Sequence, residues 1–187
     1  MRIRKRLSVP LLLVAALTAY ALFNTPAGLI QDPVPTASEG PAPDAYASGV
    51  SLRAFSEAGI LLERTDAREL RRFDGPGRVE LDAPQRWSFD AQGSWFAVSQ
   101  QGELFEHRDV LELRGDVELR YESRSVTFAT EGMIIHLDKQ TARSTSAVRA
   151  WQDDERSEMR ADTLFADLDR RVAILNGNVR SVYVPEN

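Results

Sequence analysis

The chain has 187 residues, of which 43% are hydrophobic and 27% are charged, and its formal net charge is −5. This composition suits one folded domain with an additional segment and argues against a disordered protein. The negative charge argues against a nucleic-acid partner, and the absence of cysteine excludes disulfides, a thiolate nucleophile and a cysteine-based zinc site.

The N-terminus combines a basic segment with an uncharged apolar run. Residues 1–6 read MRIRKR, and no charged residue occurs between Leu7 and Phe23. Basic residues before an apolar segment hold that end in the cytoplasm, so we expect the rest of the chain to be exported. The 17-residue run at 7–23 fits a transmembrane anchor at the short end of the usual length. Because AYA at 19–21 also fits a signal-peptide cleavage site, the residues alone leave both readings open.

A linker is predicted to follow the apolar run. Residues 24–49 contain five prolines with several alanines and glycines, and they show little apolar periodicity. Such a composition is typical of an extended, flexible tether. The folded domain is therefore expected at 50–187, with its strands between about Val50 and Pro185.

This domain reads as a series of short strands. RWSFDA (86–91), SVTFAT (125–130) and MIIHL (133–137) alternate in side-chain character, and a period of two is typical of strands. Gly, Asp and Asn punctuate the series, which indicates an all-β fold of the sandwich or jelly-roll type. The segment 61–73 also fits a helix, and we predict strands there.

One short phrase occurs twice. LELRGDVELRY at 111–121 is followed by AILNGNVRSVY at 173–183, with leucine, glycine, valine and tyrosine in the same relative places. We interpret the copies as two hairpin units that stack to share an interior, with Gly115 and Gly177 as bulges that bend them. Gly59 is read as a turn glycine that needs a positive φ.

The sequence offers little catalytic chemistry. His107 and His136 lie far apart without a metal-ligand spacing, and the acidic run 153–155 fits a solvated turn. No nucleophile elbow, phosphate-binding loop or zinc-protease motif occurs. We therefore expect no catalytic residue, metal or cofactor. A carbohydrate-active jelly roll with two facing carboxylates remains the enzymatic alternative.

The order of motifs resembles the LptC family. These motifs are the basic N-terminus and apolar segment, then GILLERTDA, RFDGP, LELRGDV, VTFATEGMIIHLDKQTARSTSAV and the closing LNGNVRSVY. The resemblance covers nearly the whole chain. It implies a twisted β-jelly roll, an uncleaved N-terminal helix in the inner membrane, and a domain in the periplasm.

The resemblance also implies a function in lipopolysaccharide export. The expected partners are lipopolysaccharide, the LptF and LptG permease with its LptB ATPase, and the LptA bridge protein. Acyl chains need shielding from water because each exposed CH₂ costs about 0.8 kcal/mol. From parity and resemblance together, we predict that the shielding groove is lined by Phe73, Phe89, Phe128, Ile135, Leu164 and Val179.

The last strand is expected to be a free edge. It lies at the end of the chain, carries one arginine, and has no proline before Pro185, whereas edges are usually blocked by such residues. The resemblance names the LptA bridge as the protein that extends it by β-augmentation. The residues predicted to form this edge are Val179, Ser181, Val182, Tyr183 and Val184. A soluble, LptA-like bridge with a cleaved signal is the alternative.

Overall fold

The computed structural model describes residues 42–91, 93–152 and 157–183. Within these ranges the regular structure consists of strands and two short 3₁₀ helices, which confirms the predicted all-β fold and the strand at 61–73. No helix in the described part of the chain is long and apolar enough to cross a membrane. The predicted anchor, 7–23, lies outside the described residues.

In the described part of the chain, fourteen strands form one continuous sheet, and every pairing between them is antiparallel. The strands are β1 (Ala45–Phe55), β2 (Leu61–Phe73), β3 (Arg78–Asp82), β4 (Gln85–Asp90), β5 (Gly93–Val98), β6 (Gln101–Phe105), β7 (Val110–Tyr121), β8 (Val126–His136), β9 (Thr141–Ser144), β10 (Val148–Gln152), β11 (Ser157–Ala161), β12 (Thr163–Asp167), β13 (Val172–Asn176) and β14 (Arg180–Tyr183). The 3₁₀ helices are η1 (Glu106–Arg108) and η2 (Glu122–Arg124). β1 begins at Ala45, inside the range predicted as linker, so the folded region starts earlier than residue 50.

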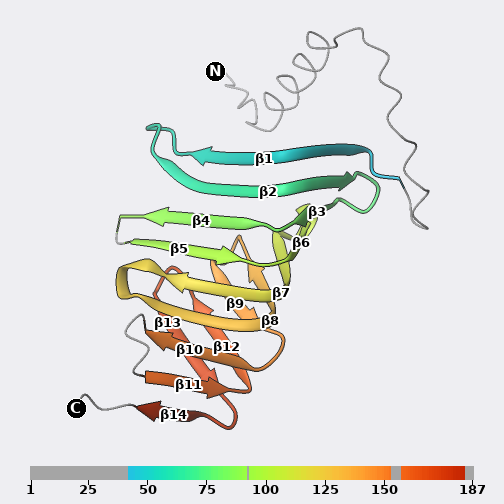
Figure 1. The fold of residues 1–187 in the computed structure, drawn as a ribbon. Coiled ribbons are helices and arrows are strands. Elements are labelled where there is room, and N and C mark those ends of the chain that lie inside the picture. Colours follow the sequence, from blue (N-terminus) through green and yellow to red (C-terminus); the bar gives the residue numbers. More distant parts are fainter. Residues whose placement is uncertain (1–41, 92, 153–156, 184–187) are drawn as a thin grey trace, which may run out of the picture. The chain divides into compact units, whose positions relative to one another are not determined.

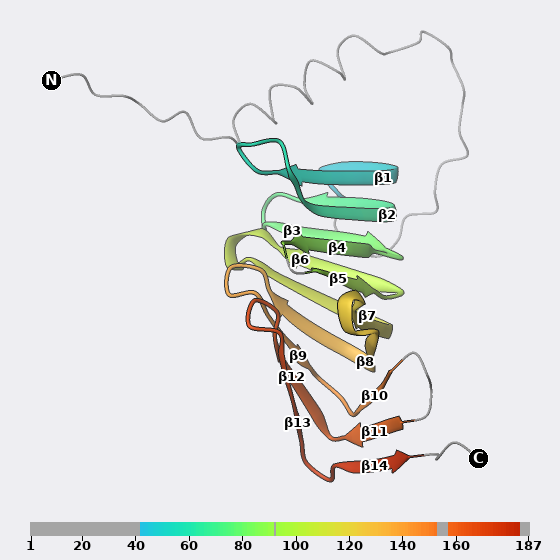
Figure 2. The ribbon, with the colours of Figure 1, turned by 90° about the vertical axis from the view of Figure 1, so that its left-hand side faces the viewer.

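Each long stretch of strand bends near its middle, and this divides the sheet into two half-sheets. Half-sheet A contains β4, β5, β10, β11 and β14, with the first part of β2 and β8 and the last part of β7. Half-sheet B contains β3, β6, β9, β12 and β13, with the remaining parts of those long strands. Figures 1 and 2 show the strands stacked from β1 at one end to β14 at the other.

The chain follows a period of about 16 residues through this stack. The turn residues Gly77, Gly93, Asp109 and Ser125 all have positive φ and follow one another at intervals of 16. Backbone hydrogen bonds join successive bends: the Ala83 amide donates to the Gln100 carbonyl, and the Gln100 amide donates to the Gly115 carbonyl. The bends therefore line up as one seam that folds the sheet.

The repeated phrase marks two of these bends. Gly115 and Asp116 have φ of 75° and 46°, and Gly177 and Asn178 have φ of 75° and 45°. In each copy a single chain segment crosses from one half-sheet to the other at this pair. The hairpin interpretation is therefore corrected: each copy is one segment that bends from half-sheet B into half-sheet A, as β7 in the first copy and as β13 followed by β14 in the second. Two successive left-handed residues turn the segment across the seam. The register between β7 and β8 shifts between Arg114 and Val117, on either side of Gly115.

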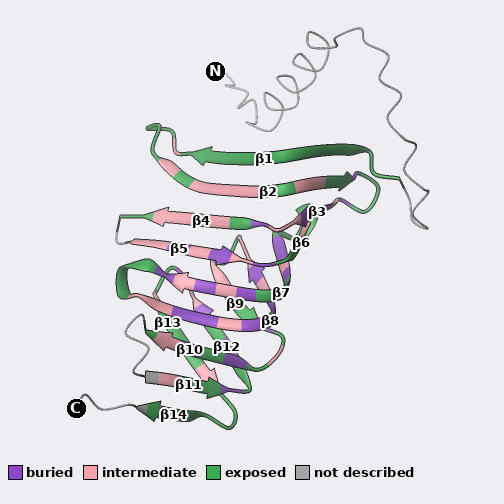
Figure 3. Ribbon diagram, in the orientation of Figure 1, coloured by how far each residue is buried: buried purple, intermediate pink, exposed green. Residues whose placement is uncertain are grey.

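The core lies between the two half-sheets. Figure 3 shows buried residues concentrated along β7 and β8, and exposed ones along β1 and β14. The core cluster is made of Ala67, Val79, Leu81, Trp95, Ala97, Leu111, Leu113, Val117, Leu119, Tyr121, Phe128, Met133, Ile135, Ala142, Val148, Ala150, Ala161, Leu164, Ala166 and Leu168. Both half-sheets contribute, so the interior is one apolar layer enclosed by a folded sheet.

Candidate functional site: the apolar interior and the free edges

Three of the predicted groove residues lie in the interior. Phe128 on half-sheet A is 5% exposed, and Ile135 and Leu164 on half-sheet B are 4% and 1% exposed. All three belong to the same core cluster. The alternation of SVTFAT and MIIHL thus identified inward positions on both half-sheets.

The other three predicted groove residues lie elsewhere. Phe89 pairs with Ser94 and lies on the face opposite to Trp95, so the register places it on the outer surface. Phe73 is buried but outside the core cluster, with the Arg78 guanidinium 4.7 Å from the centre of its ring. Val179 follows the bend of the last strand and is 52% exposed.

Sequence reasoning missed the interior role of Trp95. Its ring packs on Tyr121, with ring centres 4.7 Å apart, and its indole N–H donates a 3.0 Å hydrogen bond to the Leu168 carbonyl. The alternation of Trp95 and Ala97 in GSWFAV was the signal that could have identified this strand as inward-facing. This hydrogen bond joins half-sheet A to the turn after β12 on half-sheet B.

An ion pair joins the half-sheets on the same side of the interior, and we call this side the opening. Arg171 Nη2 lies 2.7 Å from Asp90 Oδ2, and this hydrogen bond raises the pKa of Arg171 above its usual range. Together with the bond from Trp95 to Leu168, it fastens the hairpin of β4 and β5 to the turn after β12. We call these two interactions the latch.

Little free space remains behind the latch. The cavity among Trp95, Leu119, Ile135 and Leu168 has a volume of about 20 Å³, which is room for about one water molecule. An acyl chain can enter this interior only if the two half-sheets move apart.

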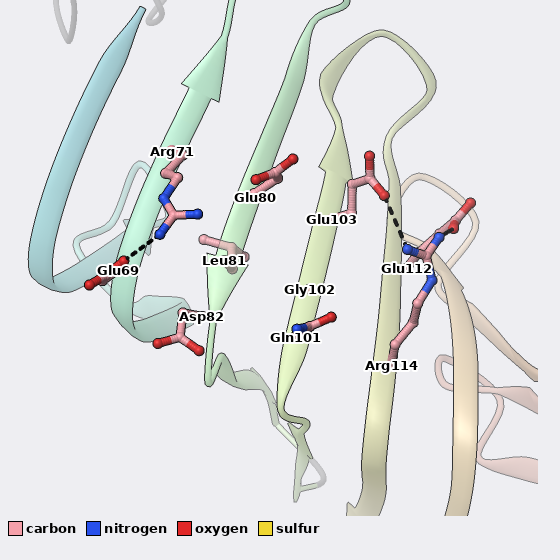
Figure 4. Close-up of a pocket in the computed structure, with 10 residues that line it drawn as sticks. All are labelled: Glu69, Arg71, Glu80, Leu81, Asp82, Gln101, Gly102, Glu103, Glu112 and Arg114. Atoms are coloured by element: carbon pink, nitrogen blue, oxygen red, sulfur yellow. Dashed lines mark hydrogen bonds and ion pairs between the residues drawn. The ribbon is translucent and has the colours of Figure 1, made fainter. Parts of the chain in front are cut away.

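A larger hollow lies on the outer face of half-sheet B and is polar (Figure 4). Glu80, Glu103 and Glu112 lie directly opposite one another on β3, β6 and β7. Arg78 contacts Glu80 at 3.0 Å, and Arg114 contacts Glu112 at 2.7 Å. The hollow measures about 470 Å³, but its charged lining makes it unsuitable for an acyl chain.

The last two strands, β13 and β14, are edges of half-sheets B and A, respectively. Among the described residues, β14 pairs only with β11, and β13 pairs only with β12. Ser181 is exposed and Val182 is 64% exposed. The main chain of Tyr183 pairs with Ser157, whereas Val184 lies outside the described residues. Of the predicted edge residues, Ser181, Val182 and Tyr183 therefore lie on β14, which has one unoccupied side in the described structure, and Val179 directly precedes this strand.

The first strand is the opposite edge. β1 pairs only with β2 in the described structure, and its large side chains face solvent: Tyr46 is 58% exposed, Leu52 52% and Phe55 56%. Both ends of the stack can thus accept a strand from another protein.

The three predicted structural glycines have positive φ. Gly59 has a φ of 77° and lies in an open turn, where an added Cβ would meet no atom within 4 Å beyond its chain neighbours. An added Cβ would crowd the end of the Gln100 side chain at Gly115, and it would lie 2.8 Å from the Asp162 Cβ at Gly177. Glycine is therefore favoured by the backbone conformation at both bends, and at Gly177 also by the lack of space.

Comparisons with known proteins agree with this architecture. The family model described as "Lipopolysaccharide-assembly, LptC-related" matches residues 11–184. The crystal structure of LptH from Pseudomonas aeruginosa, described as an LptA homologous periplasmic component of the lipopolysaccharide transport device, is similar with a TM-score of 0.53. That likeness has 10% sequence identity and covers 66% of this chain and 95% of LptH, so it shows a shared fold. A search of curated proteins found no significant match. Because the family model spans most of the chain and confirms the resemblance in the sequence, the chain belongs to the LptC-related family of lipopolysaccharide-assembly proteins.

Proposed function

We propose that this chain carries lipopolysaccharide across the periplasm by shielding its acyl chains between the two half-sheets. The observation that carries the proposal is the apolar layer containing Phe128, Ile135 and Leu164. A chain of about a dozen carbons gains roughly 10 kcal/mol when its CH₂ groups leave water. Its sugars and phosphates remain in solvent, and the protein acts as a carrier rather than as an enzyme.

Loading requires the latch to open. Separation of Trp95 from the Leu168 carbonyl and of Arg171 from Asp90 leaves the half-sheets connected along the bent strands. The half-sheets then hinge about the seam and expose the interior along one side. Acyl chains enter sideways and replace the contacts that the two inner faces make with each other.

The two edges connect the carrier to its neighbours in the transport system. The last strand pairs with the N-terminal edge of an LptA-type bridge protein, which continues the interior toward the outer membrane. β1 pairs with the periplasmic part of the LptF and LptG permease, which LptB drives by ATP hydrolysis. Support comes from the unoccupied side of each edge strand and from the exposed apolar side chains on β1.

Residues 7–23 anchor the chain in the inner membrane, with residues 1–6 in the cytoplasm and the folded region in the periplasm. This part of the proposal rests on the basic residues before an uncharged run. A soluble bridge would instead lose this segment after export. The N-terminal sequence of the protein recovered from membranes distinguishes the two.

Proline variants test the edge assignment. Ser181→Pro and Val182→Pro each remove one backbone donor from β14, and successive donors point to opposite sides of a strand. One variant therefore blocks the free side without breaking the pairing with β11. We expect that variant to fold and to lose capture of the bridge protein, while retaining the permease.

Glu57→Pro is the control, since this residue lies in the exposed turn between β1 and β2. If both proline variants fold and bind the bridge protein as strongly as the control does, this edge is not the docking site.

A further inference from the structure

A row of three arginines crosses the outer face of half-sheet A at the end of the stack. Arg149 lies directly opposite Arg160, and Arg160 lies directly opposite Arg180. All three are exposed, while Ala150 and Ala161 beside them are buried, which places the arginines on the outer face. Like charges in directly opposite positions destabilise a sheet, so this arrangement needs compensation.

The described structure supplies little compensation for these cations. Glu158 lies 2.6 Å from Arg160 Nε and 4.0 Å from Arg149 Nη1. Arg180 makes no ion pair with any described residue. β14 runs from Arg180 through Ser181 and Val182 to Tyr183 and contains no carboxylate. Among the described residues, one carboxylate thus pairs with two of the three guanidinium groups, and the third, Arg180, lies on the free edge without such a pair.

The glutamate row on half-sheet B provides a comparison within the same protein. Glu80, Glu103 and Glu112 are also directly opposite one another. Arg78 bridges Glu80 and Glu103 at 3.0 and 3.5 Å, and Arg114 bridges Glu103 and Glu112 at 3.5 and 2.7 Å. The glutamate row within the sheet is therefore neutralised by neighbouring side chains, whereas in the described structure the arginine at the free edge, Arg180, is not.

We propose that Arg180 binds a carboxylate side chain on the strand that extends β14, at the position directly opposite it. This inference rests on the proposed edge pairing and adds the chemistry that selects the incoming strand. The carboxylate would continue the row and offset the charge of Arg160 and Arg180. Because side chains alternate between faces, a slip of one residue would move it to the other face. The arginine row thus fixes the register.

The same row disfavours a second copy of this chain as the partner. Two β14 strands paired edge to edge would bring two uncompensated cationic ends together without supplying a carboxylate. Opposite charges on a partner are favoured and like charges are rejected, which is a common basis of pairing specificity.

The test uses the full chain in detergent and the purified LptA-type bridge protein of the same organism. Arg180→Gln should weaken binding about fivefold, the change that corresponds to about 1 kcal/mol for one exposed ion pair. Arg180→Glu should weaken it more than about tenfold because the new charge repels the carboxylate, while Arg180→Lys should retain most of the affinity. Binding of Arg180→Gln should also depend less on salt concentration than that of the unmodified chain.

Arg124→Glu is the matched control, since Arg124 is an exposed arginine in η2, away from the last strand. If Arg180→Glu binds the bridge protein normally while the folded proline variant of β14 does not bind it, this inference is overturned and the edge assignment remains intact. Normal binding by the folded proline variants would instead overturn the edge assignment itself. If Arg180→Glu binds the bridge protein normally but no longer binds phosphatidylglycerol vesicles, the inference is overturned and Arg180 binds a lipid phosphate instead.

Discussion

Replacing Trp95 by phenylalanine should loosen the latch without emptying the core. The substitution removes the indole N–H that donates to the Leu168 carbonyl at 3.0 Å, but an aromatic ring remains to pack on Tyr121. A buried hydrogen bond contributes about 1 kcal/mol, and an acceptor left without a partner costs up to about 3 kcal/mol. We therefore expect a loss of about 1–3 kcal/mol, which corresponds to roughly 4–12 °C in Tm for a folded region of this size.

The functional effect should have the opposite direction. If acyl chains enter by separating the half-sheets, a weaker latch lowers the cost of opening, and Trp95→Phe should capture lipopolysaccharide faster than the unmodified chain. Thermal unfolding followed by circular dichroism measures the first effect, and time-resolved photo-crosslinking from an interior position measures the second. Trp87→Phe is the control, because Trp87 lies on the outer face and stacks on Phe96. Equal stability and equal capture rates for the two variants would refute the latch.

Three further predictions concern the bend, the acid response and the opening. Gly177→Ala should destabilise the fold by about 2 kcal/mol or more in urea unfolding, since φ is 75° and Asp162 crowds the site. Gly75→Ala is the control and should change the unfolding free energy little, because there is open space around Gly75. Similar losses of stability in both variants would contradict the role of Gly177 in the bend. The hydrogen bond from Arg64 holds the pKa of Asp66 below its ordinary value of 3.8. The stability that Asp66 contributes is therefore present above about pH 4 and is lost as the pH falls through the pKa of Asp66 in the folded protein. Asp66→Asn should make the unfolding free energy decline less steeply in that acid range. An unchanged dependence of the unfolding free energy on pH would exclude the Arg64–Asp66 pair as a contributor. Asp90→Cys and Arg171→Cys, introduced together and joined by a short cleavable bis-maleimide, should block lipopolysaccharide capture until the linker is cut. Capture by the cross-linked protein would show that entry does not use this opening.

Alternation of side chains was sufficient to predict the strands and several inward positions. SVTFAT and MIIHL lie along the two halves of one long strand, β8, where Phe128 and Ile135 face the interior as expected. The closing phrase also predicted a terminal edge strand. These features are local, because they depend on which residues alternate along each segment.

Phe89 could not be placed by the same rule, because its strand is polar on the inner face. Arg86 and Ser88 face the interior near the opening, where Arg86 contacts Glu63 at 2.7 Å. The aromatic residues of this strand face outward, and Trp87 contacts both Phe96 and the guanidinium of Arg64. The apolar residues of β4 identify one face of the strand, but they do not show whether that face points inward. The pairing of β4 with β5 shows that it points outward.

The 16-residue period was also hidden from sequence inspection. The bends share a backbone conformation and a position in the seam rather than a residue type: one uses Ala83, another Gly115 with Asp116, and the last Gly177 with Asn178. Only the two bends with glycine at the first position produced a visible repeat. Their common role depends on hydrogen bonds between bends, which no single segment encodes.

The central claim is that acyl chains lie between the half-sheets, and site-specific photo-crosslinking tests it most directly. A photoreactive residue at Phe128 or Ile135 should capture lipopolysaccharide in cells, because both positions face the interior. The same residue at Phe89 or Arg143 should not, since Phe89 lies on the outer face and Arg143 is exposed between the buried Ala142 and Ser144. Equal capture at the interior and outer positions, or capture confined to the outer ones, would contradict the account.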